Sequence, residues 1–141
     1  MLDKENNSEK INDYELKIFS QFGEDGIIDF LYKKLNLKNK TFIEFGVEDY
    51  EESNTRFLLE ARNWKGLIID SSKGFIDKIK SKDYYWRNNL KAINAFVTVE
   101  NINNLIKENL HFENLDLMSI DIDGNDYWVW KAITICKPAV V

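Results

Sequence analysis

The hydrophobic and polar positions of the chain follow two alternating patterns. Short apolar runs rich in Ile, Val and Phe predict buried strands at 41–46, 66–70, 91–97 and 115–122. Between these runs, apolar residues recur every three or four positions, as they do on one face of a helix. This spacing predicts helices over 22–35, from Ser53 to about Asn63, after Ser71 or Ser72 through Ile79, over 102–110 and over 126–134. The last four residues, PAVV, predict the start of a fifth strand.

Strands that alternate with helices predict an α/β fold, with a mostly parallel sheet and helices on both faces. We assign residues 1–17 to a polar N-terminal tail and residues 18–141 to one domain. A four-residue final strand would leave an unfinished sheet edge. We therefore expect the sheet to be truncated at its fifth strand, with the C-terminal part of the domain missing.

The carboxyl ends of the predicted strands indicate where a ligand would bind. In an open parallel sheet, ligands lie beyond these ends, where the strand order reverses. The residues at the predicted ends are Glu44 to Gly46, Asp70, Phe96 and Asp121.

Composition narrows the class of partner. The chain of 141 residues has a formal net charge of -5, and its lysines are scattered among acidic residues, which disfavours a nucleic-acid partner. A single Cys and a single His exclude an internal disulfide and any Cys-rich or His-based metal centre. Neither a signal-peptide core nor a membrane-spanning run is present. We expect a cytoplasmic protein with a small-molecule or glycan substrate, and with Cys136 and the four tryptophans in its core.

Glu44, Gly46 and Asp70 are candidate ligand-binding residues, each with a structural alternative. Glu44 could accept a hydrogen bond from a ligand amine or orient its own loop, and Gly46 could admit a ligand close to the backbone or serve only the turn. Asp70 follows Gly46 by 24 residues, near the spacing at which an acid holds ribose hydroxyls in dinucleotide-binding folds. Asp70 could equally cap the next helix, although Ser71 or Ser72 could do so instead.

The residues after Gly46 indicate the charge of the ligand. Four acids follow within six residues: Glu48, Asp49, Glu51 and Glu52. A pyrophosphate needs a helix N-terminus free of nearby anions, so this loop disfavours NAD or ATP. A ligand with a cationic centre, such as S-adenosylmethionine, is not repelled in this way.

A third acidic motif, SIDIDGNDYWVW, places Asp121, Asp123 and Asp126 within six residues. Acids at a strand end could bind a divalent metal, polarise a sugar hydroxyl or include a general base. They could also merely cap the helix that follows. The motif is not a calcium loop of the EF-hand type, because its glycine is fourth instead of sixth and its twelfth residue is Ala132.

Taken in order, five segments resemble the FkbM-type family of class I S-adenosylmethionine-dependent methyltransferases. The segments are SQFGEDGIIDFL, FIEFGVEDYEESNTRFLL, GLIIDSS, INAFVTVENINNLI and LDLMSIDIDGNDYWVWKAI, and together they cover roughly residues 18–141. The resemblance implies a Rossmann-like core with strand order 3-2-1-4-5. It also implies methyl transfer to a hydroxyl, often on a sugar of a glycan or on a secondary metabolite.

The resemblance implies a role for each residue at a strand end. Glu44 and Gly46 match the start of the cofactor loop, and Asp70 matches the acid that grips the ribose hydroxyls. Phe96 lies near the tip where the adenine packs, and Asp121 lies close to the methyl donor and acceptor.

The segment before the first predicted strand also matches the family. Its residues Ser20, Gln21 and Glu24 are expected to reach the methionine end of the cofactor. The chain departs from the family where Glu48 and Tyr50 replace glycines of the usual E-x-G-x-G-x-G loop.

The expected mechanism is an in-line displacement in which a substrate oxygen attacks the sulfonium methyl. Asp121 or Asp123 could take the hydroxyl proton or hold a divalent metal that lowers its pKa. Two other functions stay open at this point. One is a cofactor-binding module without catalysis, truncated or degenerate, and the other is a nucleotide-sugar or phosphate-handling enzyme on a similar sheet.

Overall fold

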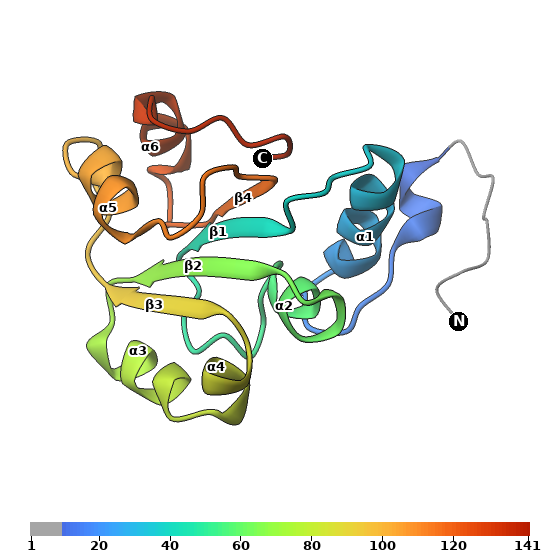
Figure 1. Ribbon diagram of the computed structural model, residues 1–141, viewed down its shortest axis with the longest axis horizontal. Helices are drawn as coiled ribbons and strands as arrows, with labels where there is room; N and C mark the ends of the chain where they lie inside the picture. The colour runs from blue at the N-terminus through green and yellow to red at the C-terminus, as the bar shows by residue number, and fades with distance from the viewer. Residues whose placement is uncertain (1–9) are drawn as a thin grey trace.

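The computed structural model describes residues 10–141, which form a parallel sheet flanked by helices (Figure 1). Its four strands are β1 (Thr41–Phe45), β2 (Lys65–Asp70), β3 (Leu90–Asn94) and β4 (Leu117–Ile120). All neighbouring strands are parallel, and their order is β3-β2-β1-β4. The predicted α/β, Rossmann-like fold is confirmed, and the predicted strand order is confirmed for its first four strands.

The predicted fifth strand is present only as a single bridge. Val140 lies beside Leu117 in a parallel arrangement. The Met118 N–H donates to the Val140 carbonyl over 3.0 Å, and the Val140 N–H donates to the Asp116 carbonyl over 3.0 Å. These two bonds hold the C-terminal segment next to β4 without extending into a strand.

Six α-helices and one 3-10 helix accompany the sheet in the described residues. They are η1 (Ile11–Tyr14), α1 (Glu24–Lys34), α2 (Arg56–Arg62), α3 (Lys73–Lys80), α4 (Asp83–Arg87), α5 (Ile102–Asn109) and α6 (Asp126–Ala132). Each of the five predicted helices is present, within two residues at most ends. The sequence pattern missed α4 and η1, because a helix of four or five residues is too short to show a helical period.

Strands β3 and β4 end earlier than predicted because their neighbours stop pairing with them. The Ala95 N–H makes the last bond to the sheet, at the Asp70 carbonyl, and the Asn101 side chain then bonds the Phe96 carbonyl in a turn. The Asp121 N–H makes the corresponding last bond at the Phe45 carbonyl. Phe96 and Asp121 therefore lie in loops just beyond their strands.

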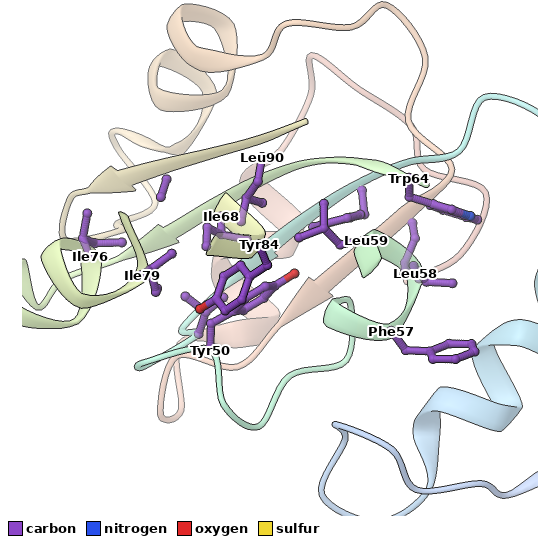
Figure 2. Close-up of a cluster of buried hydrophobic side chains, with 14 residues drawn as sticks. Tyr50, Phe57, Leu58, Leu59, Trp64, Ile68, Ile76, Ile79, Tyr84 and Leu90 are labelled. Carbon is purple, nitrogen blue, oxygen red and sulfur yellow. The ribbon is translucent and has the colours of Figure 1, made fainter. Parts of the chain in front are cut away.

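Alternation along the strands divides the core into two layers. Phe42 and Ile68 face a cluster that includes residues of α2, α3 and α4, with Tyr50 and Tyr84 in contact at 5.9 Å between ring centroids (Figure 2). Ile43 and Leu67 face the opposite cluster, to which α5 and α6 contribute. Figure 1 shows α5 and α6 on one side of the sheet and α3 and α4 on the other.

The predicted tail, residues 1–17, is described only from residue 10 onward, and its first nine residues lie outside the described part. Within the described part, η1 packs on α1, where the Tyr14 ring stacks on Phe30 with centroids 3.7 Å apart. The boundary at residue 17 thus falls inside a segment that contacts the domain.

The prediction that all four tryptophans are core residues was wrong. Trp64 is buried, but Trp86, Trp128 and Trp130 are exposed. On α6 only Val129 is fully buried, because a helix of seven residues presents only a small part of its surface to the sheet. Its two tryptophans lie on the exposed part. Cys136 is half-buried and packs at the edge of the α5–α6 cluster.

Across residues 10–141, no helix has the length and apolar character that crossing a membrane requires.

Candidate functional site

A cavity of about 840 Å³ opens where the carboxyl ends of the four strands meet. Its lining includes seven of the residues that the sequence singled out: Gln21, Glu44, Gly46, Asp70, Phe96, Asp121 and Asp123. Glu24 also lines the cavity, whereas Ser20 is fully buried outside the lining. The parallel topology therefore gathers side chains from five separate segments around one space.

Glu44 is held by its own protein neighbours. One carboxylate oxygen accepts hydrogen bonds from the hydroxyls of Ser53, over 2.7 Å, and Thr55. The other accepts from the Asn54 N–H over 3.1 Å and from the Ser119 hydroxyl over 3.3 Å. Burial raises the pKa of Glu44, and the four hydrogen bonds oppose that shift. Of the two roles foreseen for Glu44, the structure shows the orientation of the loop.

Gly46 is required by the protein backbone itself. Its φ is +72°, and a Cβ built on it would lie 1.6 Å from the carbonyl oxygen of Asp121. Its N–H donates to the Ile69 carbonyl over 3.0 Å. The missing side chain thus lets the end of β1 pass close to the end of β4, and the atom that approaches most closely belongs to the protein.

Asp70 connects two loops at the floor of the cavity. One carboxylate oxygen accepts from the Glu48 N–H over 2.9 Å, and the other accepts from the Ser72 N–H over 2.7 Å. Ser72 itself caps α3, since its hydroxyl oxygen accepts from the Phe75 N–H over 3.3 Å. Asp70 is 8% exposed, and that exposed part faces the cavity. Each oxygen keeps a lone pair that could accept from a ligand hydroxyl.

Glu48 and Tyr50 adopt the left-handed backbone conformation, with φ of +48° and +63°. This conformation is favoured by glycine and strained for other residues. Tyr50 is fully buried, and its hydroxyl is hydrogen-bonded to Thr55 Oγ1 over 2.8 Å. Packing and this hydrogen bond hold the loop in a glycine-like path without glycine.

The four acids of this loop divide into two pairs. Asp49 forms a salt bridge with Lys78 over 2.6 Å, and Glu51 forms one with Arg56 over 3.1 Å. Glu48 and Glu52 line the cavity instead, and neither carboxylate has an ion pair within residues 10–141. Asp49 and Glu51 are thus paired with basic side chains, whereas Glu48 and Glu52 are exposed beside the cavity.

The cavity as a whole is acidic. Seven carboxylates line it: Glu24, Glu44, Glu48, Glu52, Asp70, Asp121 and Asp123. None of the described residues that line it is Lys, Arg or His. A cationic ligand would be attracted to such a space, and an anionic one would be repelled.

The acids after β4 have different roles. Asp126 accepts hydrogen bonds from the N–H groups of Ile122, over 2.7 Å, and Gly124, over 3.1 Å, and these backbone bonds lower its pKa. Asp121 and Asp123 are exposed at the cavity, and neither side chain has a hydrogen-bond partner within residues 10–141. Asp126 therefore shapes the loop, while Asp121 and Asp123 are available to a ligand.

Three exposed phenylalanines line the cavity, of which only Phe96 was predicted from the sequence. Phe22, Phe75 and Phe96 are 72%, 38% and 70% exposed. Phe22 and Phe75 were missed because both fall inside predicted helices, whose apolar residues are expected to be buried. In the structure Phe22 lies just before α1, and Phe75 is an exposed residue of α3. Aromatic rings beside a cavity provide flat apolar surface for a ring-shaped group.

Asp121 and Asp123 do not belong to a larger group of metal ligands. In residues 10–141, no three side chains of His, Cys, Asp or Glu are grouped so that they could hold a metal ion.

Models of known protein families and the sequences of curated proteins yield no match to this chain.

Proposed function

We propose that the protein is a cytoplasmic S-adenosylmethionine-dependent methyltransferase that methylates a hydroxyl on a small molecule or glycan. One observation carries this proposal. The cavity at the carboxyl ends of the parallel strands is lined by seven carboxylates and, among the described residues, by no basic side chain.

The charge of the cavity favours this cofactor over its rivals. S-adenosylmethionine carries a positive sulfonium and a positive ammonium group against one carboxylate. NAD, ATP and nucleotide sugars carry phosphates, which bind where backbone N–H groups or basic side chains meet them. Glu48 and Glu52 stand unpaired where such phosphates would lie, so their charges oppose phosphate binding.

The lining residues match the parts of the cofactor. Asp70 offers carboxylate lone pairs to the two ribose hydroxyls, and Phe96 and Phe75 offer aromatic surface to the adenine. Gln21 and Glu24 are suited to the methionine end, where a carboxylate favours the ammonium group. At Glu48 and Tyr50, where the FkbM-type loop has glycines, the φ angles lie in the left-handed region that glycine favours.

The chemistry of the site follows from these positions. When bound, S-adenosylmethionine supplies an electrophilic methyl group. The chain's own residues would hold the acceptor hydroxyl beside that group, and most of the rate enhancement would come from this positioning. Asp121 or Asp123, both exposed and without partners in residues 10–141, accepts the proton that the hydroxyl loses.

Calorimetric titration with S-adenosylmethionine and, separately, with NAD tests this proposal. We expect the wild-type protein to bind S-adenosylmethionine and not NAD. The Asp70→Asn variant should bind at least about tenfold more weakly, because it loses charge-assisted hydrogen bonds to the ribose.

The matched control is Asp77→Asn on α3, which removes an exposed acid outside the cavity lining and should leave the affinity unchanged. Failure of the wild-type protein to bind S-adenosylmethionine, or equally tight binding of NAD, would overturn the proposal. Wild-type affinity of the Asp70→Asn variant would show that Asp70 does not bind the cofactor.

A further inference from the structure

Asp25 is a buried acid next to the wall of the cavity. It is the second residue of α1 and is 1% exposed. The residues just before it, Gln21, Phe22 and Glu24, line the cavity. Asp25 itself does not line the cavity, so it is not a candidate for direct contact with a ligand.

A single oxygen of Asp25 binds three consecutive backbone N–H groups. Oδ2 accepts from Ile18 over 2.8 Å, from Phe19 over 2.6 Å and from Ser20 over 2.8 Å. In return, the Ser20 hydroxyl oxygen accepts from the Asp25 N–H over 3.0 Å. Three bonds to one oxygen hold the backbone of three consecutive residues against a single side chain. Asp25 therefore anchors residues 18–20 to the start of α1.

The anchored segment is also bonded to the loop after β1. The Phe19 carbonyl accepts from the Ser53 N–H over 3.1 Å, and the Ser53 hydroxyl donates to Glu44 over 2.7 Å. The Arg56 guanidinium lies over the Phe19 ring, 4.4 Å from its centroid. A continuous set of polar contacts thus runs from Asp25 through residues 18–20 and Ser53 to Glu44.

We propose that Asp25 is a positioning residue, which fixes the wall formed by Gln21, Phe22 and Glu24 relative to the end of β1. Without the anchor, this wall would lose its register with the loop that carries Ser53. The effect on cofactor affinity rests on the proposed function, whereas the effect on the wall does not.

The test compares Asp25→Asn with a matched variant, Asp29→Asn. Asp29 lies one turn later on α1, is 3% exposed and binds Arg62 over 2.7 Å, outside the cavity lining. Both variants replace one buried carboxyl group of the same helix with an amide. Two measurements are made on each: hydrogen exchange at the amides of residues 18–20, scaled to the amides of β1, and affinity for S-adenosylmethionine by calorimetry.

We expect Asp25→Asn to accelerate exchange at residues 18–20 and to weaken binding about tenfold, and Asp29→Asn to change neither. Equal exchange and equal affinity in the two variants would overturn the inference. If the wild-type protein does not bind S-adenosylmethionine, the proposed function fails, and the exchange comparison still decides whether Asp25 anchors the wall.

Ser20→Ala provides a milder variant should Asp25→Asn fail to fold. It removes the reciprocal bond to the Asp25 N–H and the side-chain hydrogen bond between Ser20 and Glu24, but it keeps the three bonds to Asp25 Oδ2, so we expect a smaller acceleration of exchange at residues 18–20. Suppose that Asp25→Asn is unfolded and that Ser20→Ala exchanges at the wild-type rate. Asp25 would then contribute only to overall stability, and its proposed role at the wall would be overturned.

Discussion

Gly46 and Glu44 determine how the end of β1 is built. Gly46 lets the backbone pass the Asp121 carbonyl, where any side chain would collide. Glu44 gathers the hydroxyls of Ser53, Thr55 and Ser119 around one buried carboxylate. Both residues shape the cavity through contacts within the protein, so their substitution is expected to affect folding as well as binding.

Gly46→Ala should destabilise the protein by about 2–4 kcal/mol, because it combines left-handed backbone strain with a steric collision. Gly124→Ala is the matched control. Its φ is +103°, but a Cβ there would meet nothing within 4 Å, so strain alone should cost about 1–2 kcal/mol. Urea denaturation of the two variants gives both free energies of unfolding. Equal losses would show that the contact with Asp121 relaxes without cost.

The helices take their positions from capping groups and from the sheet. At α3, Ser72 supplies the cap, and Ile76 and Ile79 are buried against the sheet. At α2, the N-cap is Thr55, and the Ser53 hydroxyl oxygen accepts from the N–H groups of Thr55 and Arg56. The short helix α4 depends instead on Tyr84, whose burial is a tertiary contact.

Ser72→Ala should lower the free energy of unfolding by about 1 kcal/mol, because it leaves the Phe75 N–H without its cap. The neighbouring Ser71→Ala is a suitable control, since Ser71 is exposed and its only described hydrogen bond uses the backbone carbonyl. This control should change stability by less than about 0.5 kcal/mol. Thermal or urea denaturation distinguishes the two. A larger loss in Ser71→Ala would reassign the cap.

The net charge of -5 is unevenly distributed over the molecule. Basic residues near the loop after β1, such as Lys78 and Arg56, pair with Asp49 and Glu51. The cavity keeps its carboxylates without basic neighbours in its lining. Unpaired negative charge is therefore concentrated at the carboxyl end of the sheet, where it would attract a cationic ligand.

The double variant Glu48→Gln/Glu52→Gln should bind S-adenosylmethionine about threefold more weakly, as expected from Coulomb attraction across solvent. The control is Asp49→Asn/Glu51→Gln, which makes the same change in net charge among acids that are already paired. Calorimetry at low and high salt measures both variants. The difference between the first variant and wild type should shrink in high salt because of screening. Equal losses in the two variants would indicate that only net charge matters.

The sequence predicted where the site lies better than it predicted the role of each residue in it. The strand ends could be read from apolar runs, and the geometry of a parallel sheet brings such ends together. The partners of Glu44, Asp70 and Asp126 could not be read in this way, because they come from loops whose paths depend on packing. Phe22 and Phe75 were missed because the pattern does not show which aromatic rings the fold leaves exposed.

The amino-acid sequence by itself determined the α/β alternation, the strands and the acidic character of the cavity, because these depend on periodicity and residue type. Only the tertiary structure decided which acids are neutralised. Asp49 and Glu51 form salt bridges with Lys78 and Arg56, whereas Glu48 and Glu52 are exposed beside the cavity and have no ion pair within residues 10–141. This division depends on the left-handed backbone at Glu48 and Tyr50, which is maintained by burial of the Tyr50 ring. The backbone path of this loop is set by contacts between residues distant in sequence. A local pattern of hydrophobic and polar residues does not contain information about such contacts.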